Sequence, residues 1–419
     1  MTVVMVAVFA LLLLLSFPVG YALVISSGAA VMTMGSVPTV ISVIKLFQPT
    51  QSFPLLAIPF FILSGALMMS GTLGQKLVRF AAALVGRYPG GLAQVTVVGS
   101  TIFGGVSGSA VAEASALGSM LIPWQKREGY PAAFGAAATA SSSVIAGLIP
   151  PSIPLILYAA VSNASIASLF LAGILPGLML AGGMMIVCYV SGRMRNFPLL
   201  KSEGGLRALG TATVAALPAL LMPAFILVLL RFGIATPTEV SVIAVAYALL
   251  VSILIYRDLT VKRIYAALMG TVVTTGVVML VIAASNLVGY VLITEAIPNA
   301  VAGYAESVLK EPWLIILAMN LIMLVVGMFL DLPAAILLLG PTFVAVGSAI
   351  GMDTIQLGIM MAVNLSIGLF TPPIGTTLFI SAAISREPIG AIVRELWPFY
   401  LVALIVLGLV SYVPATILY

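Results

Sequence analysis

The sequence predicts an all-α polytopic membrane protein, organised as an inverted repeat with two re-entrant helical hairpins and two helices broken at Pro-Pro pairs. Of its 419 residues, 62% are apolar and 7% are charged, whereas about a quarter of a typical soluble domain is charged. Apolar runs of about 20 residues, long enough to cross a bilayer, recur along the chain. Two of these runs contain Pro-Pro, at Pro150–Pro151 and again 222 positions later at Pro372–Pro373.

The apolar runs give the expected helices in order. The first run, Val3 to Val24, has no basic leader and no small-residue cleavage site, so we interpret it as a retained helix rather than a signal peptide. The run at 154–190 is long enough to contain a break and two helices. The expected helices span 2–24, 28–47, 52–72, 131–148, 154–190, 210–231, 238–256, 264–292, 313–328, 355–370 and 396–418.

Charge indicates the orientation of the chain in the membrane. The basic residues lie in short connectors, which the positive-inside rule places in the cytoplasm. The connector at 294–312 is acidic and suits the outer face. The net charge of +5 therefore does not indicate nucleic-acid binding. Separately, the chain has a single cysteine, Cys188, so an internal disulfide is excluded. The basic connector residues are Lys76, Arg79, Arg87, Lys126, Arg127, Arg193, Arg195, Lys201, Arg207, Arg257, Lys262 and Arg263.

An offset of 222 relates the two halves of the chain. It pairs residues that shape the backbone, so chance is a poor explanation. The connector 124–130 carries Lys126 and Arg127, whereas its counterpart 346–354 carries only Asp353, so the repeats are predicted to be inverted. The further matched pairs are Gly105 with Gly327, Ala112 with Ala334, Gly118 with Gly340, Ile145 with Ile367 and Pro176 with Pro398.

Two Gly-centred stretches, 92–123 and 325–349, do not fit simple spans. FGGVSGSAVAEASALG at 103–118 combines poor helix formers with hydroxyls. Non-helical backbone is tolerated at membrane depth only where it is buried in protein or lines a cavity. We therefore expect a re-entrant hairpin with its tip at Ser107–Ser109. The alternative, a small-residue packing face, does not explain the matching stretch VGMFLDLPAAILLLG, where Asp331 stands at the position of Ser109.

The chain is not expected to be an enzyme. GVSG resembles the surroundings of a nucleophilic serine, but the sequence has no histidine to pair with it or to bind zinc. Aspartyl catalysis needs two facing carboxylates, and Asp331 has no obvious partner.

Three acidic residues are expected at membrane depth, where each is a functional candidate. Glu113 could pair with a basic group, and a structural role is slightly favoured for it. Glu239 follows Thr236-Pro237-Thr238 and is interpreted as part of a helix N-terminal cap. For Asp331, at the second hairpin tip, a role at substrate or ion is favoured.

The Pro-Pro breaks are expected to expose carbonyls. Proline removes an amide donor and denies a preceding carbonyl its helical hydrogen bond. Around Gly147–Ile149 and Gly368–Thr371 the freed oxygens suit a hard cation. We therefore predict two cation sites, each between a hairpin tip and its own break. The alternative is a pair of proline kinks needed only for packing.

These motifs resemble the large membrane subunit of a tripartite ATP-independent periplasmic (TRAP) transporter. The resemblance runs through most of the chain. It implies an elevator-type transporter in the bacterial inner membrane that couples uptake of an organic acid, such as a dicarboxylate, sugar acid or sialic acid, to sodium. It also implies two partners, a small four-helix membrane subunit and a periplasmic substrate-binding protein. The segments that carry it are FGGVSGSAVAEASALG, GLIPPSIPLILYAAVSNASIASLFLAGILPGLML, GIATPTEVSVIAVAYAL and NLSIGLFTPPIGTTLF.

The resemblance also implies site residues. Sodium is the expected cofactor. Its ligands would be Ser107, Ser109, Gly147 and Pro150 at the first site, and Gly327, Gly368, Thr371 and Ile374 at the second. The substrate would contact Ser107, Ser152 and Asp331. One departure concerns Pro333, which stands where the family often has a small hydroxyl residue.

The implied organisation alternates scaffold and transport segments. Scaffold helices would occupy 1–91 and, with a linker, 191–312. The first transport repeat would span 92–190 with a broken helix at 131–162. The second would span 313–419, with a hairpin near 325–349, a broken helix at 355–385 and a C-terminal helix.

Two other functions remain open at this stage. A self-sufficient carrier or antiporter of the same superfamily would use Glu113 or Asp331 with protons. A channel would need a continuous polar path, and the sequence has two local polar clusters without a ring of charge. The sequence does not identify the organic acid, because no arginine falls in the hairpins or breaks.

Overall fold

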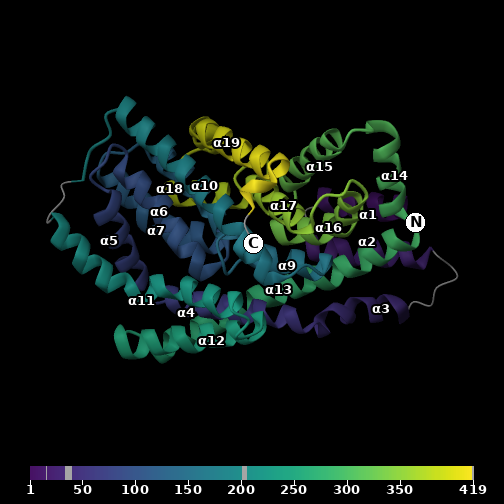
Figure 1. The fold of residues 1–419 in the computed structure, drawn as a ribbon, viewed down its shortest axis with the longest axis horizontal. Helices are drawn as coiled ribbons and strands as arrows, with labels where there is room; N and C mark the ends of the chain where they lie inside the picture. Colours follow the sequence, from purple (N-terminus) through teal and green to yellow (C-terminus); the bar gives the residue numbers. More distant parts are fainter. Residues whose placement is uncertain (16, 34–39, 201–204, 418–419) are drawn as a thin grey trace.

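The computed structural model describes every residue except 16, 34–39, 201–204 and 418–419 (Figure 1). In these described residues the secondary structure is helical throughout, without strands. The first half contains α1 (Thr2–Leu14), α2 (Val19–Met32), α3 (Val40–Phe47), η1 (Gln48–Gln51), η2 (Phe53–Leu56), α4 (Ala57–Met69), α5 (Leu73–Val85), α6 (Gly91–Ser107), α7 (Ala110–Arg127), α8 (Ala132–Ser142), η3 (Ser143–Gly147), α9 (Ile153–Ser162) and α10 (Ile166–Met194). The second half contains α11 (Gly205–Arg231), α12 (Pro237–Leu250), η4 (Val251–Ile255), α13 (Val261–Thr294), α14 (Ile297–Leu309), α15 (Pro312–Gly327), α16 (Leu332–Ala349), α17 (Thr354–Gly368), α18 (Thr376–Ser385), α19 (Ile389–Tyr412) and η5 (Pro414–Thr416).

The predicted repeat is confirmed helix by helix. Adding 222 to the bounds of α7 gives 332–349, the bounds of α16. The same offset carries α6 to α15, α8 to α17, α9 to α18 and α10 to α19 within a few residues. Even the positive-φ glycines after the second hairpin arms correspond, at Gly129 and Gly351.

The two repeats are related by a reciprocal exchange of contacts. The half-helix α9 packs on α16 of the other repeat, and its counterpart α18 packs on α7. Likewise α8 packs on α19, and α17 packs on α10. The equivalent helices α5 and α14 lie at opposite ends of the long axis of the molecule (Figure 1). This reciprocal arrangement is compatible with the inverted repeat predicted from the charge of the connectors.

Both hairpins are present, and the second differs from its predicted bounds. The first consists of α6 and α7 with its tip at Gly108, as expected. The second consists of α15 and α16 and so covers Pro312–Ala349, rather than only 325–349. The helix expected at 313–328 is its first arm, because the chain turns at Met328–Asp331 before Pro333 starts the next helix.

The N-terminal prediction was wrong in its boundaries. Instead of one helix at 2–24, α1 ends at Leu14 and α2 begins after Pro18, which is compatible with the first turn of a helix. The expected helix at 28–47 falls partly on 34–39, outside the described residues, and α3 begins at Val40. Together, α3 to η1 and η2 to α4 form one candidate span bent by 61°.

Three further boundaries differ from the sequence prediction. The connectors around Lys76 and at 294–312 contain helices, α5 and α14, that hydropathy alone does not reveal. The last helix begins at Ile389 rather than near 396, because Pro388 precedes it as a cap. The predicted break within 154–190 is confirmed, since Asn163 ends α9 in a left-handed conformation before Ser165 caps α10.

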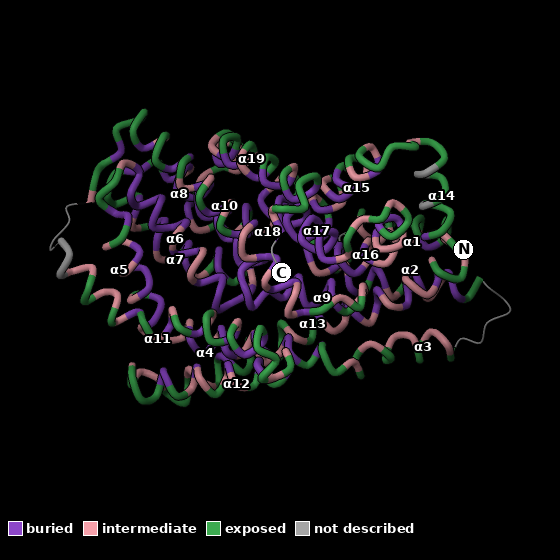
Figure 2. Tube along the Cα trace, in the orientation of Figure 1, coloured by how far each residue is buried: buried purple, intermediate pink, exposed green. Residues whose placement is uncertain are grey.

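Burial places the broken helices at the centre of the molecule. Every residue of α8 is buried except Ala133, which is partly buried, and all residues from Ile355 to Gly368 in α17 are buried (Figure 2). Helices on the periphery, such as α12 and α13, expose large apolar side chains, as lipid-facing helices do. Six helices of the described chain are long and apolar enough to cross a membrane.

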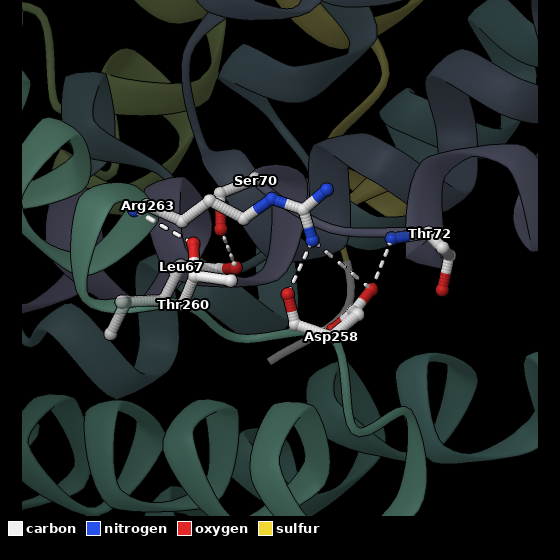
Figure 3. Close-up of polar contacts among 6 residues, drawn as sticks. All are labelled: Leu67, Ser70, Thr72, Asp258, Thr260 and Arg263. Carbon is white, nitrogen blue, oxygen red and sulfur yellow. Dashed lines mark hydrogen bonds and ion pairs between the residues drawn. The ribbon is translucent and has the colours of Figure 1, made fainter.

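Polar contacts join the end of α4 to the connector before α13 (Figure 3). Asp258 accepts a hydrogen bond from the Thr72 amide, and Arg263 Nη1 lies 3.9 Å from Asp258 Oδ2. Nearby, Lys76 of α5 sits 3.8 Å above the ring of Tyr256. Basic residues far apart in sequence therefore share one face, which the positive-inside rule identifies as cytoplasmic.

Candidate functional site

The first hairpin tip contacts the first Pro-Pro break directly. Gly108 has a φ of 61°, and a Cβ there would lie 2.2 Å from the carbonyl oxygen of Pro151, so only glycine fits. Its own carbonyl accepts from the Ile153 amide at 3.5 Å. The predicted residues Ser107 and Ser109 flank it: Ser107 ends α6, and the Ser109 hydroxyl caps α7 by accepting from the Ala112 amide at 3.4 Å.

Ser152 organises the first break. Its hydroxyl accepts from the Leu155 amide at 3.3 Å, which starts α9, and donates to the Gly147 carbonyl at 2.5 Å. The Gly147 carbonyl is therefore not free as predicted, because Ser152, five residues along, donates to it, although its second lone pair remains for another partner. In the described chain, the carbonyls of Ile149 and Pro150 have no such donor.

The second tip meets the second break in the same manner. A Cβ on Gly368 would lie 2.2 Å from the carbonyl oxygen of Gly327, so the two backbones touch. The Ile374 amide donates to the Met328 carbonyl at 3.3 Å. The predicted residues Gly327, Gly368 and Ile374 are thus brought together.

Protein donors occupy much of the second break. The Leu369 carbonyl accepts from the amide and the hydroxyl of Thr377, at 3.0 and 2.9 Å. The Phe370 carbonyl accepts from the Tyr400 hydroxyl at 2.8 Å. Thr371 donates its hydroxyl to the Ile367 carbonyl at 2.6 Å, which leaves its oxygen lone pairs for another partner. The break therefore exposes fewer carbonyls than proline chemistry alone predicts.

The two breaks also contact each other. A Cβ on Gly147 would lie 3.2 Å from the Ser366 hydroxyl oxygen. Thr377 Oγ1 lies 3.0 Å from the carbonyl oxygen of Ala140 in the other repeat, which shares the single Thr377 hydroxyl hydrogen with the Leu369 carbonyl. Ser366 is 1% exposed, and its hydroxyl has no hydrogen-bond partner in the described chain. Ser366 was not predicted from the sequence, although a hydroxyl between the apolar residues Leu365 and Ile367 could have indicated it.

We call the contact between a hairpin tip and the Pro-Pro break of the same repeat a junction. Asp331 does not lie at the first junction. It precedes α16 without capping it, and it lines a cavity of about 430 Å³ with Tyr21 of α2 and Val277 of α13. Ser107 and Ser152 lie at the first tip and break and do not line this cavity. The three residues assigned to the substrate thus fall into two locations.

The other two acids have different surroundings. Glu239 forms the predicted cap: it and Thr236 make a reciprocal capping box at the start of α12. Glu113 is completely buried, and neither carboxylate oxygen has a hydrogen-bond partner in the described chain. The elements that make the main contacts with α7, which are α6, α8, η3 and α18, contain no charged residue, so among these described helices Glu113 has no basic partner.

The oxygen atoms at both junctions suit a hard monovalent cation. Each offers backbone carbonyls and neutral hydroxyls, and the buried, unpartnered Ser366 hydroxyl stands beside the Gly147 backbone. Neutral oxygen ligands without a carboxylate cage favour weak, reversible binding of an ion such as Na⁺.

Comparison with known proteins gives consistent relationships. Residues 6–416 match the family model described as the tripartite ATP-independent periplasmic transporter, DctM component. The chain is 51% identical to the uncharacterized protein y4mL of Sinorhizobium fredii, over all of both chains. It is 38% identical to the C4-dicarboxylate TRAP transporter large permease protein DctM of Pseudomonas aeruginosa, over 93% of this chain and 91% of that one. It is 34% identical to the sialic acid TRAP transporter large permease protein SiaM of Vibrio cholerae, over 96% and 94%.

A solved structure shares the fold. The YdaH transporter of Alcanivorax borkumensis superposes with a TM-score of 0.59 over 87% of this chain and 85% of that chain, at 14% sequence identity. At that identity the likeness concerns architecture alone.

Proposed function

The chain belongs to the DctM component family of tripartite ATP-independent periplasmic transporters, and from this premise we propose that it imports an organic acid across the inner membrane by sodium symport. It is a multi-pass inner-membrane permease subunit and not an enzyme. The substrate is a carboxylate of the kind named for its relatives, such as a C4-dicarboxylate or a sialic acid.

One observation supports the coupling proposal most directly. Each hairpin tip touches the Pro-Pro break of its own repeat, through Gly108 with Ile153 and through Met328 with Ile374. Two equivalent junctions of neutral oxygens, each at a discontinuous helix, are the arrangement expected for coupling ions in secondary transporters.

Sodium would be held by the residues gathered at these junctions. At the first, these are the Ser107 and Ser109 hydroxyls with backbone oxygens of Gly147 and Pro150, and Ser366 adds a hydroxyl beside Gly147. At the second, they are the backbone oxygens of Gly327, Gly368 and Ile374 with the Thr371 hydroxyl.

The net charge moved across the membrane favours more than one sodium ion per transport cycle. An elementary charge crossing 100 mV changes the free energy by roughly 2.3 kcal/mol, so a negative-inside membrane opposes the entry of an anion. One sodium ion neutralises a monoanionic acid, and a second makes the net movement inward and favourable. The duplicated junction provides two places.

Two further chains complete the proposed transporter. The family description is tripartite and periplasmic, which supports a small membrane subunit and a periplasmic binding protein that delivers the acid. In the proposed elevator mechanism, the two repeats carry the acid past the scaffold formed by α3, α4, α12 and α13.

The test is uptake in proteoliposomes that contain the permease with both partners. An inward sodium gradient should drive accumulation of the acid that the binding protein recognises, and an equal potassium gradient should not. Uptake that ignores the sodium gradient would refute the coupling. Flux at channel rates without the binding protein would favour a pore instead.

A further inference from the structure

A second large cavity lies between the scaffold and the repeats, away from both junctions. Its volume is about 510 Å³, within the range of small-molecule sites. The scaffold contributes α3, η1, η2 and α13, and the repeats contribute the end of α9 and the middle of α16. The lining residues are Lys45, Gln48, Pro49, Ser52, Leu55, Ala160, Val161, Ile282, Ser285, Asn286, Gly289, Tyr290, Ile293, Leu337 and Pro341.

The cavity carries one positive charge. Lys45 lines it, and no acidic residue does, among the residues that the structure describes. The Lys45 ammonium donates to Gln48 Oε1 at 3.0 Å and lies 5.5 Å from the centre of the Tyr290 ring. An ammonium has three donors and is costly within a membrane protein unless an anion or water accompanies it.

Two polar side chains of α13 line the same cavity. Ser285 is 4% exposed, and its hydroxyl has no hydrogen-bond partner in the described chain. Asn286 is fixed by donation to the Lys45 carbonyl at 2.6 Å. A buried hydroxyl without a partner is unfavourable by about 1–3 kcal/mol, so Ser285 points to a ligand with oxygen atoms.

The position of the cavity identifies the compartment it faces. Arg263 lies near the cytoplasmic start of α13, and Asn286 lies about 35 Å further along that helix at 1.5 Å per residue. The end of α16 leads to the connector that carries Asp353, on the outer side. An anion that arrives from the periplasm therefore meets this cavity before the buried junctions.

We propose that this cavity is an entry site for the organic acid, where the Lys45 ammonium binds a carboxylate and Ser285 hydrogen-bonds to it. The proposal rests on the proposed function and adds to it a residue that recognises the charge of the substrate. Because both the scaffold and the repeats line the cavity, movement of the repeats would change the site and release the acid toward the first junction.

Binding can be tested without transport. Cys188 is the only cysteine and is fully buried, so Ser52→Cys places a single accessible thiol in the cavity. Succinate, gluconate and N-acetylneuraminate are the probes, and labelling by an anionic thiol reagent is the readout. At least one acid should slow labelling several-fold, and Lys45→Gln should abolish this protection while Lys45→Arg retains it. Lack of protection by all three acids would overturn the proposal.

Transport supplies the second readout. In proteoliposomes with both partners, Lys45→Gln should raise the apparent KM for the acid roughly tenfold, as loss of a charge-assisted hydrogen bond implies. Lys310→Gln is the control, since it removes the same charge from the outer face at an exposed position outside the cavity. An unchanged KM for Lys45→Gln beside an active wild type would refute the entry site alone. An inactive wild type would instead count against the proposed function.

A phospholipid phosphate is the competing occupant. Native mass spectrometry of the purified permease distinguishes it, because a lipid site would show a retained phospholipid that Lys45→Gln loses. That loss, combined with an unchanged KM, would overturn the carboxylate assignment.

Discussion

The Thr371 hydroxyl is the one side-chain oxygen among the ligands proposed for the second sodium site. It donates to the Ile367 carbonyl, and its lone pairs remain available. We expect Thr371→Ala to raise the sodium concentration for half-maximal uptake by roughly tenfold, since one ligand is lost. Sodium titration of uptake measures this shift.

A matched substitution separates coupling from folding. Thr211→Ala makes the same change at an exposed position on α11 and should leave the sodium requirement unaltered. Unchanged sodium dependence in Thr371→Ala would remove this residue from the site.

Glu113 is the most unusual single residue in the structure, because a carboxylate without a counter-charge is strongly disfavoured in a dry interior. Glu113→Gln keeps the shape and removes the possible charge, so we expect thermal stability equal to or above that of the wild type. Glu239→Ala is the contrast: it removes the acceptor that closes the capping box of α12 and should lower thermal stability. Thermal unfolding of the purified permease compares them, and a marked loss of stability in Glu113→Gln would contradict the argument.

At the scale of elements, backbone-to-backbone contact holds the second hairpin against its broken helix. A Cβ at Gly368 would approach the Gly327 carbonyl oxygen to 2.2 Å, so an alanine there requires the two backbone segments to separate. We expect Gly368→Ala to destabilise the permease by about 1–3 kcal/mol, the usual effect of overpacking. Gly390→Ala in α19, where no atom lies within 4 Å, should have little effect. Equal melting temperatures for the two variants would contradict this.

The same scale explains what sequence could predict. Gly and Pro mark backbone geometry directly, so the first hairpin tip and both breaks were predictable from Gly108, Pro150 and Pro372. Helices α5 and α14 were not, because they are short and polar enough to resemble connectors. The hydrogen bonds of Ser152 and Tyr400 to break carbonyls were also not predictable, since they depend on tertiary placement. Ser366 was missed because a lone serine in an apolar helix is ambiguous without its neighbours.

At the scale of the whole molecule, the inverted repeat makes a prediction about sidedness. Lys126 and Ser348 are equivalent under the 222-residue offset, and both are exposed at the ends of the second hairpin arms. Because basic connectors stay in the cytoplasm, we expect Lys126→Cys to react with a membrane-impermeant thiol reagent only from the cytoplasmic side. Ser348→Cys should react only from the periplasm. The buried Cys188 serves as the unreactive background in both variants. Labelling is measured in inside-out and right-side-out vesicles. If both positions react from the same side, the repeats are parallel, and the two hairpins cannot enter the membrane from opposite faces.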